Sequence, residues 1–473
     1  MHYSKAMNIC RRTFIRRFAA LSAVGAGSSY ALGLASLGEL AAQSSASQDY
    51  KALVCVFLHG GNDHANTFIP FDADNYARYA AIRGGTAGVA IARDSLSNTV
   101  LSTAIGQTLT DNQILALNPS MPRMKARYDQ GVMAPLLNVG PLLTPLTKTQ
   151  FESANTQSFP RPAKLFSHND QQSTWESFQP EGARTGWGGR IADIALSANQ
   201  NAMFTAIGVS GNTVFLNGEN ASSFQISNSG PIIMYGRTGA LYESRVAAGT
   251  LDTLLRQQYG HVLENDYAAA NARSIEYSGF VSDALKASPE VTKFGGGSGL
   301  AAQLSTVAQL IASHNTLGVK RQVFFVSMGG FDNHSDLKTK HPSLLQELDL
   351  ALDSFYASLS AMGVQENVVA FTASDFGRTL THNGNGSDHG WGGHHFLLGG
   401  SLKGGRLYGK APHVSVNSDD QVGHGRLLPT TSVDQYVASL ALWFGVSVDD
   451  LSYVAPNIGR FSQYDLGFMK MHA

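Results

Sequence analysis

Short, mostly apolar runs recur along the chain and predict buried β-strands. A run that lacks alternating polar positions is typical of a strand covered on both faces, as in a parallel sheet. The runs span residues 53–58, 132–139, 203–207, 322–328, 367–373 and 395–398. Pro135 lies inside the second run, so that strand is expected at a sheet edge or with an irregularity.

Apolar residues at helical spacing lie between several of these runs and predict helices. The predicted helices span residues 187–197, 251–287, 300–314, 343–362 and 432–444. The helix at 343–362 reaches the next strand through a short loop, which indicates a right-handed crossover in a parallel sheet. We therefore predict an α/β fold, with a doubly wound, mostly parallel sheet and helices on both faces. The 49 glycines, and a segment at 72–120 without a clear pattern, indicate loop-rich insertions.

The N-terminal segment has the features of an export signal. Residues 11–17 begin with paired arginines and end with another pair, and a weakly apolar stretch follows at 18–35, with small residues at 41–46. We predict a twin-arginine signal peptide at 1–46 and a single domain at 47–473, located in the periplasm or secreted. An amphipathic surface helix and a membrane anchor are the alternatives. The stretch is too polar for a good span, so no stable membrane span is expected in the mature chain.

Charge and cysteine content narrow the class of protein. The formal net charge is −1, and without residues 1–46 the chain carries 29 Lys+Arg and 34 Asp+Glu, a net charge of −5. This balance has no basic excess for nucleic acid, so we predict no nucleic-acid partner. The two cysteines are Cys10, in the signal segment, and Cys55, in the first strand. No disulfide within the mature chain is therefore expected.

Carboxylates follow three of the predicted strands: Asp63, Asp332 and Asp375. Ligands bind at the carboxyl ends of strands in open α/β sheets, so we expect these side chains to meet. His334 and His389 lie on the same loops, and His394 and His395 follow closely. Each residue alone is compatible with a turn or a cap. Together, carboxylates and imidazoles suit Zn, Mn, Ca or Mg, which predicts a divalent metal beside a small anionic substrate.

Two further residues suggest chemistry at such a site. Ser167 precedes Asp170 by three positions, as a helix N-cap does, and a hydroxyl there lies where anions are favoured. Arg378 follows Asp375 closely and is predicted to hold an anionic oxygen, unless it forms a salt bridge or caps a carbonyl. Ser167, Ser173 and Thr67 are the candidate nucleophiles, with Ser167, Arg378 and His389 as the predicted catalytic residues.

Five sequence stretches resemble an exported family known as domain of unknown function 1501. Besides the twin-arginine start, they are Val56 to Asp63, Phe166 to His168, Gly330 to His334, and Ser374 to Thr379 together with Asp388 to Gly390. The family is similar in fold to the alkaline phosphatase and sulfatase superfamily. This resemblance implies a metal site made of Asp63, Asp332, His334, Asp375 and His389. Phe376 replaces a histidine ligand of that superfamily, and Asp332 and His334 are closer in sequence than in many members, so a degenerate or single-metal site is compatible with the sequence.

Three functions remain open from the sequence. The first is an exported, metal-dependent hydrolase of phosphate or sulfate esters. The second is a serine esterase, because residues 58–61 resemble an oxyanion loop, although Gly208 to Asn212 lacks the second glycine of a nucleophile elbow. The third is a non-catalytic exported binding or envelope protein on a phosphatase-like scaffold.

Overall fold

The computed structural model describes residues 50–470, apart from positions 233, 235, 238, 289, 290, 292, 293 and 296. The chain divides between Asp49 and Tyr50, and the described residues belong to the second unit. The predicted signal peptide at 1–46 lies outside the described residues. Among the described helices, none combines the length and the apolar character needed to cross a bilayer.

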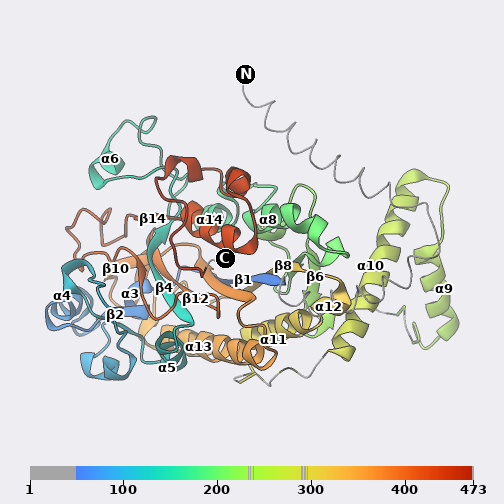
Figure 1. Cartoon of the computed structure of the whole chain (residues 1–473), viewed down its shortest axis with the longest axis horizontal. Coiled ribbons are helices and arrows are strands. Elements are labelled where there is room, and N and C mark those ends of the chain that lie inside the picture. Colours follow the sequence, from blue (N-terminus) through green and yellow to red (C-terminus); the bar gives the residue numbers. More distant parts are fainter. Residues whose placement is uncertain are drawn as a thin grey trace. The chain divides into compact units, whose positions relative to one another are not determined.

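A ten-stranded sheet forms the centre of the described unit (Figure 1). Its order is β13-β4-β12-β9-β1-β8-β5-β6-β7, with β14 paired to β4. The strands are β1 Lys51–Leu58, β4 Met133–Gly140, β5 Ala206–Gly208, β6 Phe224–Ser227, β7 Gly230–Pro231, β8 Arg321–Met328, β9 Val368–Ser374, β12 Gly393–Leu398, β13 Tyr408–Gly409 and β14 Thr431–Ser432. β12 pairs antiparallel with both of its neighbours, and β7 pairs antiparallel with β6. The other pairings are parallel, so the predicted mostly parallel sheet is confirmed.

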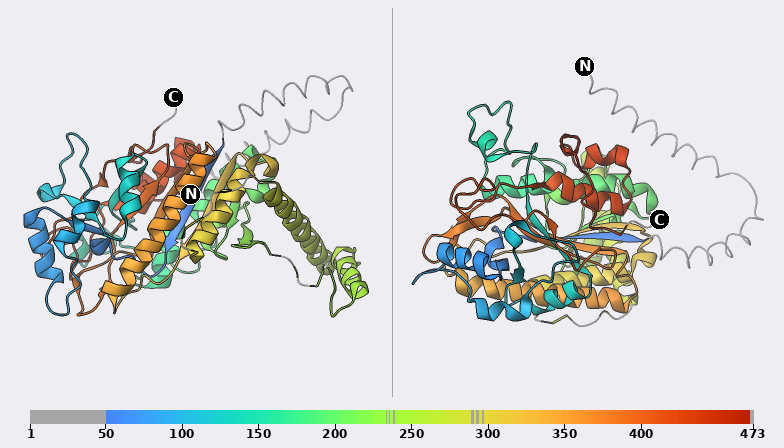
Figure 2. Two further views of the ribbon diagram at one scale, coloured as in Figure 1. Left: turned by 90° about the horizontal axis from the view of Figure 1, so that it is seen from below. Right: turned by 60° about the vertical axis from the view of Figure 1, so that its left-hand side comes forward.

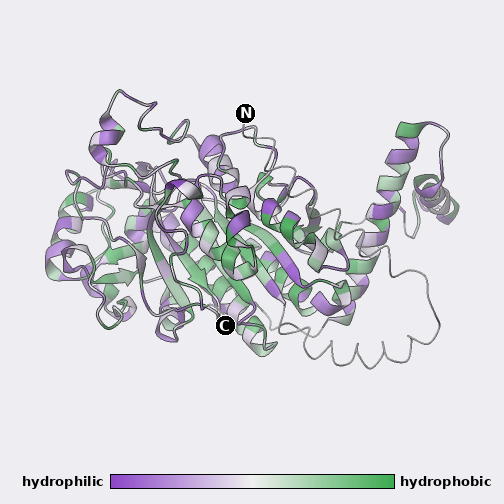
Figure 3. Ribbon diagram, turned by 45° about the horizontal axis from the view of Figure 1, so that its top comes forward, coloured by the Kyte–Doolittle hydropathy of each residue, from purple (hydrophilic) through white to green (hydrophobic). Residues whose placement is uncertain are grey.

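The two faces of β1 pack on two different helical layers (Figures 1 and 2). Ala52, Val54 and Val56 belong to a core with α5 Pro122–Asp129, α11 Gly299–Ala312 and α13 Leu337–Ala361. The residues between them belong to a second core with α8 Trp187–Ala195, α14 Val433–Phe444 and α15 Leu451–Val454. From Ala52 to Leu58, β1 is therefore apolar at every position, and Figure 3 shows the hydrophobic colouring concentrated along the sheet.

The remaining elements are short or lie outside the sheet. The further helices are α3 His64–Thr67, α4 Ala73–Arg83, α6 Lys148–Glu152, α7 His168–Ser177, α9 Arg245–Arg256, α10 Val262–Ala287 and α12 His314–Leu317. Two small sheets pair β2 Phe68–Pro70 with β3 Leu115–Leu117, and β10 Arg378–His382 with β11 Ser387–His389. Single 3-10 turns lie at Arg93–Thr99, Thr110–Asn112, Leu196–Ala198, Ala202–Phe204, Val214–Leu216, Val448–Asp450 and Ile458–Arg460.

Several predicted boundaries differ from the structure. The helix predicted at 251–287 is two helices, α9 and α10, since the chain turns at residues 257–261. The strand predicted at 203–207 begins only at Ala206, because a 3-10 turn precedes it. Pro135 itself pairs in register with Phe396, and the register shift between β12 and β4 lies further along the strand, between Leu136 and Val139. The segment at 72–120 contains α4 and β3, which its polar composition concealed.

We expect the buried His341, on α13, to make folding stability sensitive to acid. Burial lowers the pKa of His341 to about 4, while its Nε2 contacts Asn62 Oδ1 at 2.9 Å. The folded state therefore prefers the neutral ring, and stability present above the unfolded pKa near 6.5 is lost as pH falls toward 4. His341→Gln should make the decrease in the free energy of unfolding between pH 7 and 4 smaller, by up to about 3 kcal/mol, as measured by urea unfolding. Equal slopes for variant and wild type would contradict the assignment.

Candidate metal centre

Register in the central sheet brings distant loops to one edge. β1 pairs along its length with β8 on one side and β9 on the other, and Leu58 is level with both Met328 and Ser374. The loops that carry Asp332 and Asp375 therefore leave the sheet side by side. The hairpin β10–β11 folds over this edge, and Ser387 donates its backbone N–H to the Asn333 carbonyl at 3.1 Å.

Donor atoms of His168, Asp332 and His389 converge above this edge. One ligand atom from each lies within 4.8 Å of the others. His334 is also close, since its Nε2 is 3.0 Å from Asp332 Oδ1 and 2.9 Å from His389 Nε2. Carboxylate and imidazole donors at such separations are compatible with one bound divalent cation.

The second nitrogen of each imidazole is held by an acceptor. His168 Nδ1 lies 2.7 Å from Asp375 Oδ2, and His334 Nδ1 lies 3.1 Å from Asp388 Oδ1. His389 Nδ1 lies 2.8 Å from the Phe166 carbonyl oxygen. With the ring hydrogens on Nδ1, the three Nε2 atoms are free to bind a cation, the arrangement that orients metal-binding histidines. Without a cation, the contacts of His334 and His389 Nε2 with each other and with Asp332 Oδ1 need a hydrogen on at least one Nε2.

The charge of the cluster also suits a divalent ion. Three carboxylates, Asp332, Asp375 and Asp388, stand against one guanidinium, Arg378, which leaves a formal charge of −2. The side chains of Asp332 and His334 are 44% and 45% exposed, so the centre is open to solvent on this side. A small anionic ligand has access to the centre from solvent.

Local interactions set the protonation of the three central residues. Burial opposes ionisation of Asp332, but the hydrogen bond and charge of Arg378 outweigh it and hold the Asp332 pKa below its ordinary value. The hydrogen bond with Asp375 raises the pKa of His168, and burial lowers the pKa of His389. Asp332 is thus ionised and His389 neutral at neutral pH, as ligands must be, whereas the raised pKa of His168 favours its protonated ring, so a cation there would have to displace that proton.

Asp375, a predicted ligand, lies one layer behind the donors. Its side chain is fully buried, and its Oδ1 accepts the Gly60 backbone N–H at 3.1 Å. Its Oδ2 accepts Gln172 Nε2 at 2.9 Å and contacts His168. The structure therefore places Asp375 as the carboxylate that orients His168.

Asp63, also a predicted ligand, lies apart from the donor cluster. Its carboxylate forms a buried ion pair with Arg83 and accepts the backbone N–H groups of Ala65 and Asn66, which caps α3. Burial opposes its ionisation, but Arg83 and nearby histidines bring the Asp63 pKa below its usual value. Ser387 Oγ also donates to Asp63, at 3.2 Å. These partners occupy both carboxylate oxygens.

Arg378, which the sequence indicated as an anion clamp, is fully buried and fully bonded. Its Nη1 donates to Asp332 Oδ1 at 2.7 Å and to the Gly60 carbonyl at 3.1 Å. Its Nη2 donates to the Ser387 carbonyl and its Nε faces Ser387 Oγ. The salt-bridge alternative describes this geometry, because the guanidinium holds Asp332 in place and presents no exposed N–H.

The candidate nucleophiles are engaged in local hydrogen bonds. Ser167 is the N-cap residue of α7, as its spacing predicted, but its Oγ donates to Asp170 Oδ2 at 2.9 Å rather than accepting a backbone N–H. Thr67 Oγ1 donates to the Asp63 carbonyl, and Ser173 Oγ donates to the Pro180 carbonyl. The hydroxyl oxygen of Ser210, from the esterase alternative, is buried without a hydrogen-bond partner in the described part of the chain.

His168 is the donor that sequence reasoning missed. It is the first residue of α7, directly after the Ser167 cap, and a signal for it existed in the Phe166 to His168 stretch. His394 and His395, by contrast, are buried core residues. His394 Nδ1 accepts the Asn138 backbone N–H at 3.0 Å, and burial lowers the pKa of His395 to about 3.

Phe376 forms an apolar wall behind the donors. Its ring lies 4.9 Å from the His168 ring and 4.6 Å from the His389 ring, between centroids. Gly61, at φ +85°, allows this close approach, since a Cβ there would lie 2.5 Å from the Phe376 ring. This side of the cluster is therefore filled by carbon and offers no further ligand.

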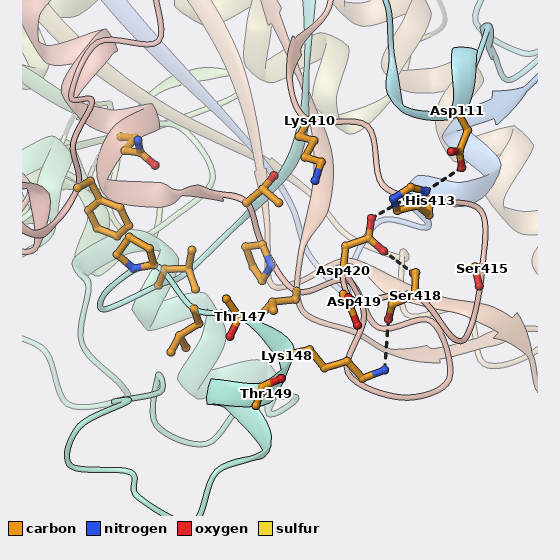
Figure 4. A pocket seen from close by; sticks show the side chains of 18 of the residues that line it. Asp111, Thr147, Lys148, Thr149, Lys410, His413, Ser415, Ser418, Asp419 and Asp420 are labelled. Carbon is orange, nitrogen blue, oxygen red and sulfur yellow. Dashed lines mark hydrogen bonds and ion pairs between the residues drawn. The ribbon is translucent and has the colours of Figure 1, made fainter.

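A separate cavity of about 920 Å³ lies between surface loops and includes none of the donors (Figure 4). Its polar side chains largely bond to one another: His413 Nδ1 lies 2.7 Å from Asp111 Oδ2, and Lys148 Nζ donates to the Ser418 carbonyl at 3.2 Å. We therefore take the converging donors, and not this cavity, as the candidate functional site.

Comparisons with known proteins give a family and distant structural likenesses. A family model described as "Protein of unknown function (DUF1501)" matches residues 50–437, which confirms the resemblance seen in the sequence. In the comparison with curated proteins, nothing matches the chain.

Solved structures with a similar arrangement include synthases and hydrolases. The lipoteichoic acid synthase LtaP from Listeria monocytogenes has 9% identity and a TM-score of 0.33, over 89% of this chain and 75% of that one. The PsFucS1 sulfatase from Pseudoalteromonas sp. has 9% identity and a TM-score of 0.35, over 92% and 76%. A mutant of alkaline phosphatase PafA has 12% identity and a TM-score of 0.21, over 70% and 63%. Likenesses this distant assign neither a substrate nor site residues.

We expect Asp63→Asn to destabilise the fold whether or not metal is present. The substitution leaves the Arg83 charge buried without its partner, which typically costs about 3–5 kcal/mol. Urea unfolding measures the loss in the presence and absence of zinc. Asp129→Asn, which breaks the exposed ion pair with Lys125, is the control and should cost no more than about 1 kcal/mol. A loss that appears only with zinc would instead make Asp63 a ligand.

Proposed function

We propose a function for this chain from its candidate metal centre, on the premise that the chain belongs to the family described as "Protein of unknown function (DUF1501)". The proposed activity is hydrolysis of phosphate or sulfate esters of small anionic substrates, dependent on one divalent cation. The observation that carries this proposal is the convergence of donor atoms from His168, Asp332 and His389. In both histidines, Nδ1 contacts an acceptor on the side away from the other donors.

His168, Asp332 and His389 would hold the cation, which leaves a coordination position open toward solvent. A catalytic zinc site characteristically has three protein ligands and one such open position. A divalent cation there supplies polarisation of a phosphoryl or sulfuryl oxygen and lowers the pKa of water. Asp375 and the Phe166 carbonyl keep two ligand rings oriented, and Arg378 keeps Asp332 ionised.

His334 is the residue best placed to move a proton. Its Nδ1 is held by Asp388, its Nε2 faces the other donors, and its side chain is 45% exposed. In that position Nε2 accepts a proton from an attacking water or donates one to a leaving oxygen. Besides water, the Ser167 hydroxyl is the candidate for attack on the ester. It must first break its hydrogen bond to Asp170.

The geometry favours one cation rather than two. Phe376 fills the space beside His168 and His389, Arg83 neutralises Asp63, and Asp375 is used by His168. A two-metal site needs further free carboxylates on this side. The degenerate site considered from the sequence therefore becomes a proposed single-cation site.

We expect the purified protein to bind about one zinc ion per chain, and chelator to remove both the zinc and any aryl phosphatase or sulfatase activity. His168→Ala and His389→Ala should each weaken zinc affinity by at least about 100-fold, because each removes a ligand. Isothermal titration and elemental analysis measure affinity and stoichiometry. His394→Ala would remove a nearby imidazole outside the cluster and is the matched control.

Two outcomes decide between the open functions. Zinc binding without turnover of phosphate or sulfate esters would support the non-catalytic binding protein. Activity that resists chelator and is blocked by a fluorophosphonate would support the serine esterase. Absence of zinc binding by the folded wild type would overturn the proposed centre.

The proposed enzyme works outside the cytoplasm, with the twin-arginine export machinery as its partner. Residues 11–17 carry the signature for this proposal, and residues 1–46 the signal. Replacing Arg11→Lys and Arg12→Lys together should retain the protein in the cytoplasm, measured by cell fractionation. The pair Arg16→Lys and Arg17→Lys is the control, since it makes the same charge-conserving substitution outside the first arginine pair, and export unaffected by either pair would contradict the signal.

A further inference from the structure

Arg426 lies against the candidate metal centre and contacts the backbone, not the imidazole, of one proposed ligand. Its Nε donates to the His389 carbonyl at 2.9 Å, and its guanidinium carbon lies 5.0 Å from the centre of the Phe166 ring. His389 is a proposed ligand, and Phe166 supplies the carbonyl that orients it. Two contacts thus fix the guanidinium next to the ligand loop.

The two terminal amino groups of Arg426 have no recorded hydrogen-bond or ion-pair partner among the residues that the structure describes. The side chain is partly buried, but neither terminal amino group is a buried unpaired atom, so both groups are open to solvent and to a ligand. Other basic groups nearby are already used. Arg378 holds Asp332, and Lys164 lies 3.2 Å from the Asp170 carboxylate. Arg426 is thus a cation in a fixed position whose terminal N–H groups remain available to a ligand.

The backbone at Phe166 supports the same conclusion. Phe166 has φ of 73°, in the left-handed region that costs a residue with a side chain about 1–2 kcal/mol. This conformation accompanies a carbonyl directed at His389 and a ring placed under Arg426. A single strained residue therefore supports both a metal ligand and a cationic group.

We propose that Arg426 binds the phosphate or sulfate group of the substrate through its two terminal amino groups. A planar guanidinium offers two parallel N–H donors that match two oxygens of such an anion. Tethering by Nε and stacking on Phe166 pre-organise this fork before the anion arrives. The proposal deepens the proposed function and rests on it for the identity of the substrate group.

The test measures binding of inorganic phosphate and sulfate to the full mature chain, with and without zinc, by isothermal titration. Arg426→Gln should weaken phosphate affinity by about 10-fold or more, since it removes a charge-assisted bidentate contact. Arg426→Lys should recover part of that loss, because lysine restores the charge but not the fork. Zinc affinity should change by less than about 3-fold in both variants.

Arg93 provides a matched control. Its Nε donates to the Phe71 carbonyl at 2.7 Å and its guanidinium carbon lies 5.0 Å from the Phe71 ring centre, the same geometry away from the donors. Arg93→Gln should leave phosphate and zinc affinity unchanged, while showing any stability cost of losing such a stacked arginine. Acetate titrated into the wild type shows whether a planar carboxylate binds equally well, which would contradict selection of a tetrahedral anion.

Failure of this inference is separable from failure of the metal centre. Equal phosphate affinity of wild type and Arg426→Gln, or no phosphate binding by the wild type, overturns the role of Arg426 whatever zinc does. Phosphate binding that depends on Arg426 while zinc does not bind would overturn the metal centre alone. Thermal unfolding of each variant accompanies the titrations, and Arg426→Lys serves where the glutamine variant does not fold.

Discussion

The alignment of three parallel strands is the constraint on which the candidate site depends. β8, β1 and β9 end at the same level, so loops from residues near 60, 330 and 375 leave the sheet together. Parallel strands cannot be joined by a tight hairpin, so each connection is long and passes through a helical layer. The chemistry at the edge is therefore assembled from segments that lie from about 50 to more than 200 residues apart, and α13 and α11 pack against the strands from one face.

Burial separates three similar carboxylates into three roles. Asp332 remains 44% exposed and ionised beside Arg378, so it is available as a ligand. Asp375 is buried and directs the His168 ring, while Asp63 is buried and paired with Arg83. A buried carboxylate is stable only when its lone pairs are satisfied, so these two are committed to protein partners. An aspartate after a strand thus indicates where the site lies, but not whether that aspartate binds a metal, orients a ligand or forms an ion pair.

Buried arginines follow the same logic. Arg378 and Arg83 bond to carboxylates and carbonyls and stabilise the fold around the centre, although the buried Nε of Arg83 has no partner among the described residues. Arg426 is held at Nε and by stacking, and its two terminal amino groups have no partner among the described residues. The difference that supports the proposed role of Arg426 is that its unpaired donors are not buried, and no sequence pattern encodes that. The proposed single cation and the proposed anion contact would together neutralise a small charged ester in one place.

The sequence by itself determined the α/β class, most strands of the sheet, the family, and the segments that form the site. Apolar runs and strand-end carboxylates are local signals, since burial on both faces and position after a strand are both readable along the chain. Asp332 was predicted as a site residue in this way, and His334 and His389 were predicted from their place on the same loops. Only the tertiary structure brought His168 to the cluster, gave Asp63 to Arg83, and enclosed Arg378. Those outcomes depend on pairings between residues 20 or more positions apart and on which side chains water can reach, and neither quantity is contained in spacing along the chain.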